Sequence, residues 1–151
     1  MNISEMDPST RETLQRIITS CVYGNLATIG ADGKTPRVRP VCAFLQEDFS
    51  ILVPSHTNTR KIEELEKNPR AEICFVDAEH WQVRAECAVE VVADESVKKK
   101  LIETTLQPKL WRGFFPEGEK DPNFVLYRLL PESFAWMKEW ELKYRRVDVP
   151  G

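Results

Sequence analysis

Residues 55–70 read SHTNTRKIEELEKNPR, and this stretch decides how the middle of the chain folds. The apolar residues 51–53 before it predict the end of a β-strand, and Arg60 and Lys61 open a short helix. A helix start leaves backbone N–H groups unpaired and carries the positive end of the helix dipole. Hydroxyl groups precede this helix at Ser55, Thr57 and Thr59. The combination predicts a site for an anion, most naturally a phosphate group.

The flanks of this helix set its bounds. Asn58 or Thr59 is expected to be the N-cap, and Pro69 ends the helix because it restricts the backbone of Asn68. The alternative for the two cations is an ordinary solvated surface, where most Arg and Lys side chains lie.

A second pair of cations comes earlier, on a predicted strand at residues 35–45. Arg37 and Arg39 point to the same face of that strand because side chains alternate with a period of two. The strand at residues 49–53 is expected to be its hairpin partner, which would bring both arginines beside residues 55–61. Up to four positive charges would then face the anion. The alternative is that the arginines protect a sheet edge.

Short strands joined by tight turns account for most of the chain. A strand at residues 25–29 is expected to run into a turn at residues 30–33. Further strands are expected at residues 35–45 and 49–53 and, beyond the short helix, at 71–76 and 81–92. Two more are expected at residues 124–130 and 133–140, and residues 107–122 are expected to be a loop holding Trp111. Helices are predicted from Asp7 and Pro8, with a capping box of Ser9 and Glu12, and at residues 95–105. Six or so strands with helices around them predict a small β-barrel.

Length and charge narrow the classes of protein. With 151 residues, the chain is expected to be one domain, residues 1–151, with frayed ends at 1–6 and 145–151. A net charge of −3 argues against nucleic acid or an anionic membrane as partner. No apolar run is long enough for a membrane span, and no secretion signal opens the sequence.

Cysteine and histidine usage excludes several chemistries. The four cysteines lie in apolar stretches without a C-x-x-C motif, so buried free thiols and a reducing cytoplasm are expected. His56 and His80 are the two histidines, which argues against zinc hydrolases and Ser-His-Asp triads. His80 lies near Asp77 and Glu79 in a predicted turn, but no second histidine or cysteine accompanies them, so no metal site is expected.

Four segments in succession resemble the pyridoxamine 5′-phosphate oxidase-like, FMN-binding split-barrel family. They read GNLATIGADGK, PRVRPV, NTRKIEELEKNPRAEI and WQVRAECAVEV, and the resemblance covers residues 14–136. The segment LWRGFFPEGEKDPNF is similar to the general stress protein branch of that family. The resemblance implies a mainly β fold, a six-stranded antiparallel split β-barrel with flanking helices, and a homodimer with FMN at the subunit interface.

The resemblance also implies which residues contact the cofactor. Arg39 and the backbone near Val41 would face the flavin ring and phosphate, and Gln82 would hydrogen-bond the edge of the ring. Trp111 would approach the flavin from the partner subunit. The phosphate would be held by Ser55, Arg60 and Lys61.

The sequence departs from the oxidases of this family at its end. They carry an Arg-Leu-His-x-Arg segment for the substrate phosphate, whereas residues 134–146 read FAWMKEWELKYRR, without histidine. Oxidation of pyridoxamine phosphate is therefore not expected, and no residue stands out as a general acid or base. An FMN-dependent oxidoreductase with a nicotinamide donor and a small organic substrate is the leading expectation. A non-enzymatic flavin-binding stress or sensor protein and a dimeric interaction module remain alternatives.

Overall fold

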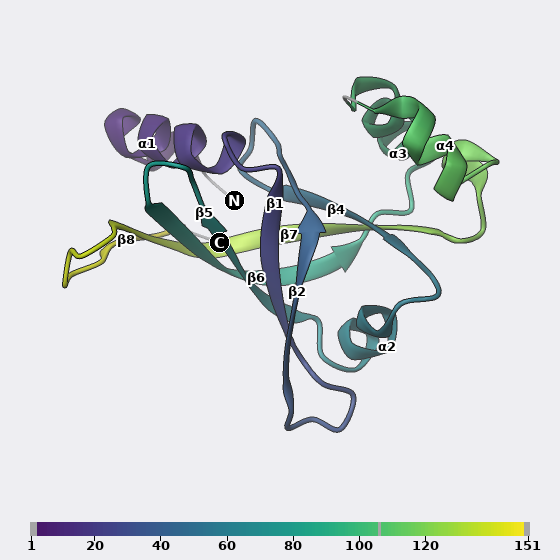
Figure 1. Cartoon of the computed structure of the whole chain (residues 1–151), viewed down its shortest axis with the longest axis horizontal. Helices are drawn as coiled ribbons and strands as arrows, with labels where there is room; N and C mark the ends of the chain where they lie inside the picture. The colour runs from purple at the N-terminus through teal and green to yellow at the C-terminus, as the bar shows by residue number, and fades with distance from the viewer. Residues whose placement is uncertain (1–2, 106, 150–151) are drawn as a thin grey trace.

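A computed structural model describes residues 3–105 and 107–149 of the chain. It contains a curled, antiparallel β-sheet whose strands run in the order β2-β1-β5-β6-β7-β4-β3, with β8 paired to β7 (Figure 1). The strands are β1 (Tyr23–Ile29), β2 (Pro36–Cys42), β3 (Phe44–Leu45), β4 (Ile51–His56), β5 (Arg70–Val76), β6 (Trp81–Val91), β7 (Phe124–Lys138) and β8 (Arg145–Asp148). The predicted mainly β, antiparallel architecture is confirmed, with eight strands in place of six.

The long strand β7 organises the sheet. Along one edge it pairs with β6, and along the other it pairs first with β4 and then with β8. The sequence predicted two strands here, at residues 124–130 and 133–140. Pro131 lies where the register between β6 and β7 shifts, opposite Cys87, so the strand continues through an irregularity. The prediction of two separate strands was wrong.

Four helices and two short 3-10 turns surround the sheet: η1 (Ile3–Glu5), α1 (Pro8–Thr19), α2 (Arg60–Lys67), α3 (Glu95–Thr104), α4 (Pro108–Phe114) and η2 (Gly118–Lys120). In Figure 1, α1 lies over one end of the sheet, whereas α3 and α4 lie together at the other end. The Asp7 carboxylate caps α1 by accepting the Thr10 N–H at 3.0 Å, so Asp7, and not the expected Ser9 and Glu12 box, starts this helix.

Two predictions for irregular segments were wrong. Residues 107–122 contain α4 and η2, because Pro108 begins a helical turn and Trp111 of α4 packs against the smaller hydrophobic cluster. Residues 145–148, expected to fray, form β8 because β4 covers only the first part of β7's outer edge and leaves the rest free to pair. At the other end, Met6 is buried in the core.

Two hydrophobic clusters hold the elements together. The larger one includes Leu14, Ile17 and Ile18, whose helical spacing places them on the one face of α1 that packs against the sheet. The smaller one joins α3 and α4 to β4 and β7 through Leu52, Val92, Leu101, Ile102, Phe115, Phe124 and Leu126. This second cluster fixes α4 beside β4, which matters for the site below.

The four cysteines are free thiols, of which Cys87 is buried and the others are partly buried. Among the described helices, none has the length and apolar composition needed to cross a membrane.

Candidate functional site

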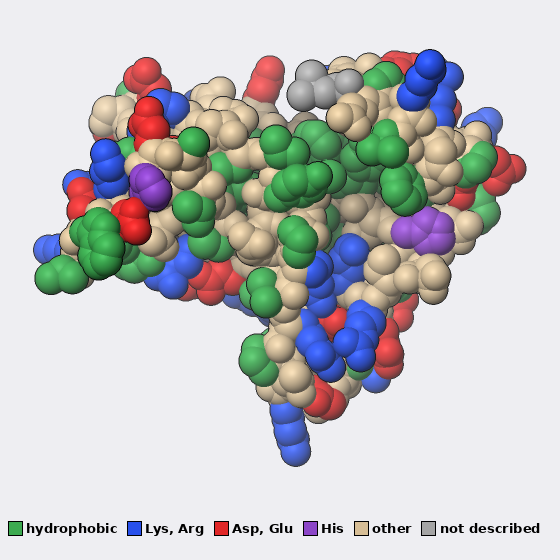
Figure 2. Space-filling model, viewed as in Figure 1, with side chains coloured by type: hydrophobic (Ala, Val, Ile, Leu, Met, Phe, Trp, Pro, Cys, Tyr) green, Lys and Arg blue, Asp and Glu red, His purple; other side chains and the backbone are tan. Residues whose placement is uncertain are grey.

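A cleft of about 220 Å³ opens between β4, the start of α2 and the helix α4. Its lining residues are Cys42, Pro54, Ser55, His56, Lys61, Leu110, Trp111, Phe114 and Phe115. Three of the predicted site residues, Ser55, Lys61 and Trp111, therefore meet in one cleft of one chain. In the space-filling view, apolar side chains on the side of α4 lie above a group of Lys and Arg side chains over β2 and α2 (Figure 2).

Ser55 offers a polar group without a partner. The residue is only 4% exposed, and its Oγ makes no hydrogen bond within the part of the chain that the structure describes. A buried hydroxyl without a partner is costly, and native proteins rarely leave one except where a ligand or water completes it. The Ser55 hydroxyl thus marks the floor of the cleft as a place for a polar ligand.

The two threonines beside Ser55 serve the fold instead. The Thr57 hydroxyl donates to the Asn123 side chain at 2.8 Å, and the Thr59 hydroxyl donates to the backbone oxygen of His56 at 2.8 Å. Thr59 is the N-cap residue of α2, as expected, but its side chain makes no capping hydrogen bond. The first turn of α2 therefore keeps backbone N–H groups available, while the predicted set of three hydroxyls reduces to one.

Lys61 is half-buried in the cleft wall and makes no hydrogen bond or ion pair with any described residue. Burial lowers the pKa of its amino group, the Arg39 charge lowers it further, and Glu64 opposes both effects. Its neighbour Arg60 is exposed and is likewise without a bonded partner in residues 3–105 and 107–149. An unpaired, partly desolvated ammonium is a strong attractor for a bound anion.

Arg39 and Glu64 form an ion pair beneath this wall. Arg39 Nη2 lies 2.7 Å from Glu64 Oε2, and Nη1 donates to the Thr28 hydroxyl at 2.7 Å. That hydroxyl donates in turn to Glu64 Oε2 at 2.7 Å. Burial alone would raise the pKa of Glu64, but the bonds from Thr28 and Arg39 and the charges of Arg39 and Arg37 lower it overall. Glu64 is thus an ionised carboxylate inside the fold.

We call Arg37, Arg39, Arg60 and Lys61 the cationic corner. The sequence predicted that hydrogen bonding between neighbouring strands would join its two halves. The predicted hairpin forms only where Phe44 and Leu45 of β3 pair with β4. The strand β2, which carries both arginines, pairs with β1 instead, and the other partner of β4 is β7. The corner forms because α2 packs across β1, where Glu64 reaches both Thr28 and Arg39.

Two of the predicted cofactor-binding residues, Val41 and Gln82, do not line the cleft. The side chain of Val41 is buried in the core, so only its backbone is near the cleft residue Cys42. Gln82 faces Met137 near the end of β7, whereas Ser55 faces Val125 near its start. One chain therefore does not bring Gln82 to the cleft.

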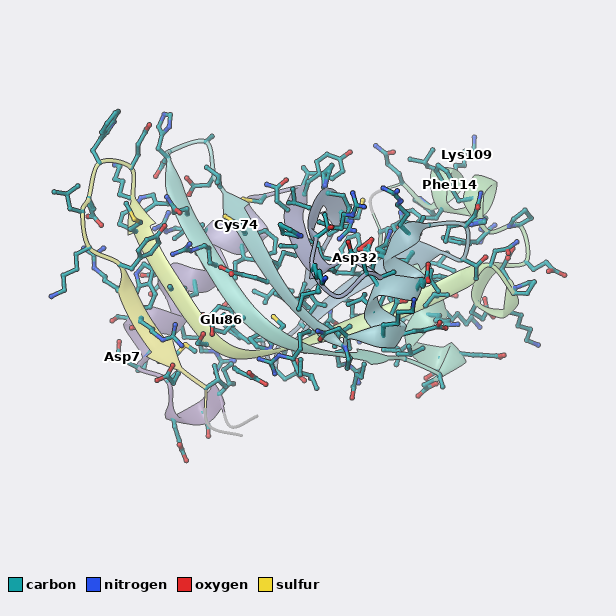
Figure 3. All side chains as sticks on the ribbon, turned by 90° about the horizontal axis from the view of Figure 1, so that it is seen from below. Asp7, Asp32, Cys74, Glu86, Lys109 and Phe114 are labelled. Atoms are coloured by element: carbon teal, nitrogen blue, oxygen red, sulfur yellow. The ribbon has the colours of Figure 1, made fainter. Side chains whose placement is uncertain are left out.

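Gln82 instead accepts a hydrogen bond from the Tyr144 hydroxyl at 2.6 Å, and Tyr144 stacks under Arg84 with 4.2 Å from the guanidinium carbon to the ring centre. In Figure 3, Phe114 and Lys109 on α4 lie to the right, whereas Cys74 and Glu86, which belong to the strands around Gln82, lie in the left half of the molecule.

Aromatic rings form the apolar wall. Trp111 on α4 packs against Phe44, Phe115 and Phe124 with ring centres 6.1–6.5 Å apart. His56 stacks on Phe115 at 5.9 Å, and its Nδ1 accepts the Asn58 N–H at 3.0 Å. This wall could hold a flat, apolar ring system beside the polar floor.

Sequence reasoning missed several of these residues. Glu64 could have been found, because it stands four residues after Arg60 on the same helix face. Phe114 and Phe115 lie in residues 107–122, which the sequence predicted to be a loop. No sequence signal placed Pro54 or Cys42 at the cleft. No group of three metal-binding side chains occurs among the residues described.

Comparison with known proteins decides the family. The sequence profile of the pyridoxamine 5′-phosphate oxidase family matches residues 10–137. The chain belongs to the pyridoxamine 5′-phosphate oxidase family. General stress protein 26 of Bacillus subtilis (strain 168) is 31% identical to this family member over 122 residues, which are 78% of the chain and 81% of that protein.

Solved structures of this family share the fold. A protein related to general stress protein 26 from Clostridium acetobutylicum superimposes with a TM-score of 0.77 at 20% identity, covering 95% of this chain and 97% of the other. A pyridoxamine 5′-phosphate oxidase-related, FMN binding protein from Nostoc punctiforme PCC 73102 gives a TM-score of 0.70 at 15% identity, covering 97% and 99%. The predicted split-barrel fold is therefore confirmed.

Proposed function

We propose that this member of the pyridoxamine 5′-phosphate oxidase family binds FMN and that its phosphate lies at Ser55, Arg60 and Lys61. The observation that carries the proposal is the convergence of an unpartnered buried hydroxyl and an unpaired, half-buried ammonium at the uncapped start of α2. Each is unfavourable by itself, and a phosphate group relieves both.

The apolar wall supports the flavin part of the proposal. Leu110, Trp111, Phe114 and Phe115 line one side of the cleft beside the polar floor, so a ring and a phosphate find matching surfaces a short distance apart. Trp111 belongs to the same chain as Ser55 and Lys61, so it reaches this cleft without a partner subunit. The guanidinium of Arg39 adds charge from behind the wall, and most of its donors are engaged within the fold.

We extend the proposal to a homodimer with FMN at the subunit interface. The cleft of about 220 Å³ is smaller than the ~300–1,000 Å³ of typical small-molecule sites, so a second copy is needed to enclose the ligand. One sheet face offers the surface for it: Tyr23, Val38 and Val76 are 57–71% exposed there. Gln82 lies on that same face, because directly opposed residues share a face. A second copy packed on this face could bring its Gln82 to the flavin.

The proposed reaction is flavin-mediated oxidation or reduction of a small organic substrate with a nicotinamide partner. When bound, FMN supplies the hydride-accepting and hydride-donating chemistry. The chain's own residues anchor the phosphate through Lys61 and Ser55, and the aromatic wall excludes water from one face of the ring. No residue of the cleft stands in a hydrogen-bonded pair that would indicate acid–base catalysis. We place the protein in the cytoplasm, where free thiols persist.

A non-enzymatic flavin-binding stress or sensor protein is the second candidate. The likeness to general stress protein 26 favours it, since that name describes a stress response and no reaction. Both candidates require FMN in the cleft, and they differ in turnover.

A visible spectrum of the purified protein, with mass spectrometry of what it releases, tests the shared step. We expect flavin bands, or their appearance with quenched flavin fluorescence when FMN is added. A colourless protein that does not bind added FMN would refute both candidates. Steady-state NAD(P)H oxidation by the yellow protein then separates them, because storage or sensing gives no turnover.

A further inference from the structure

One buried carboxylate lies beneath the cationic corner. Glu64 is only 3% exposed and accepts hydrogen bonds from Arg39 Nη2 at 2.7 and 2.9 Å and from the Thr28 hydroxyl at 2.7 Å. On α2 it stands four residues after Arg60 and three after Lys61, positions that share one helix face. A single negative charge therefore pairs with Arg39 and acts on Lys61, which lines the cleft.

The same contacts turn Arg39 away from a direct ligand role. Its Nη1 donates to the backbone oxygen of Leu26 at 3.3 Å and to Thr28 at 2.7 Å, and its Nη2 is spent on Glu64. Only the Nε–H remains for a ligand. Arg39 therefore joins β2 to α2 as a clamp, and its charge is largely offset.

We propose that Glu64 is a positioning residue: it holds Arg39 as this clamp and, through its charge, limits how tightly the corner binds a phosphate group. Lys61, which has no bonded partner of its own, is then the main cation of the site. This inference rests on the proposed function to the extent that the cleft binds a phosphate group, and it goes further by naming what sets the affinity.

The charges around Lys61 give the inference a pH signature. Arg39 on β2 and Glu64 on α2 act on the charge of Lys61, and Arg37 on β2 acts on that of Glu64. Arg60 precedes Lys61 on α2, and His56 lines the cleft from β4. Burial and Arg39 lower the pKa of Lys61, and Glu64 is the group that raises it. Without the Glu64 charge, Lys61 loses its proton at a lower pH.

The variant Glu64→Gln tests this, with Glu63→Gln as matched control. A glutamine has the same shape and can still bond Arg39 and Thr28, but it carries no charge. Glu63 is the adjacent residue, exposed, and paired with Lys67 at 2.8 Å on the outer side of the helix. Binding of inorganic phosphate and of FMN is measured by calorimetry at low and high salt, and the Lys61 side chain is titrated by NMR in ligand-free protein.

We expect Glu64→Gln to bind phosphate about three- to tenfold more tightly at pH 7 and low salt, because one nearby negative charge is gone. Lys61 of this variant should lose its proton at a lower pH than in the parent. Because the protonated amine binds the anion, the affinity for phosphate should then also fall at a lower pH. Its melting temperature should fall, since Arg39 loses its counter-charge. Glu63→Gln should leave affinity and the Lys61 titration unchanged.

Other outcomes are equally informative. The inference is overturned if Glu64→Gln binds phosphate no more tightly than the parent, or if its Lys61 titrates at the same pH as in the parent. It is also overturned if the parent protein binds neither phosphate nor FMN. Phosphate binding without FMN binding refutes the proposed function and leaves the inference standing if affinity rises in the variant. Should Glu64→Gln not fold, Thr28→Val removes one bond but no charge and must leave affinity unchanged, whereas a tenfold change would contradict a charge effect.

Discussion

Replacing Lys61 by methionine should weaken FMN binding without destabilising the ligand-free protein. Methionine keeps an unbranched apolar stem of similar length and removes the ammonium that lies half-buried beside Arg39 without a partner. A charge-assisted hydrogen bond to phosphate is worth ~1.5–3 kcal/mol. At ~1.4 kcal/mol per tenfold, FMN should therefore bind about 10- to 150-fold more weakly to Lys61→Met.

The stability of the ligand-free protein should rise in Lys61→Met or stay the same. Burial and the Arg39 charge lower the pKa of Lys61, so the charged amine costs folding free energy in the absence of ligand. We expect the ligand-free variant to melt at or above the temperature of the parent, which rules out misfolding as the cause of weaker binding. Calorimetric scanning and flavin fluorescence titration measure the two effects on the same samples.

The control is Lys67→Met on the same helix, where the amine is exposed and paired with Glu63. That variant should keep the affinity of the parent for FMN. In the parent, affinity should fall as the pH rises through the lowered pKa of Lys61, and in Lys61→Met this loss should disappear. Equal FMN affinity in parent and Lys61→Met would refute the assignment of the phosphate to this corner.

Three further predictions follow from the same contacts. Ser55→Ala should keep or raise the melting temperature, because its hydroxyl is buried without a partner, and should weaken FMN binding by ~0.5–1.5 kcal/mol in the same titration. Trp111→Ala should destabilise the protein by ~3 kcal/mol in urea unfolding, since Trp111 joins three other rings, and should lessen flavin quenching. Acid should weaken the fold: the folded pKa of Glu64 is below its ordinary 4.5, so its contribution is complete above that pH and is lost as pH falls through the folded value. Urea unfolding between pH 6 and 3 measures that loss, and Glu64→Gln should show less of it.

The predictions that held depend on local chemistry. The Asp94 carboxylate accepts the Ser96 N–H at 2.8 Å and caps α3, the helix predicted at residues 95–105. The turn between β1 and β2 forms as expected, with the Asp32 carboxylate accepting the Lys34 and Thr35 N–H groups at 2.9 Å and Gly33 at a φ of 72°. Each depends on a few neighbouring residues, so the sequence carries the information.

The errors came where a segment becomes ordered only through contacts with distant parts of the chain. Residues 145–148 carry no strong strand pattern, and they pair with β7 only because part of its edge is open. In the same way, α4 is short and begins at a proline, and it becomes ordered through rings contributed by β3 and β7. Propensity does not contain such long-range packing.

The family, the antiparallel β architecture and the two groups of cations can be read from motif spacing and side-chain alternation. How the cations are used depends on the three-dimensional packing. This packing pairs Arg39 with Glu64 and gives Lys61 no hydrogen bond or ion pair with a described residue. The physical reason is that burial and pairing depend on which segments meet across the sheet. The same residue types therefore give a clamp at one position and an anion contact at the other.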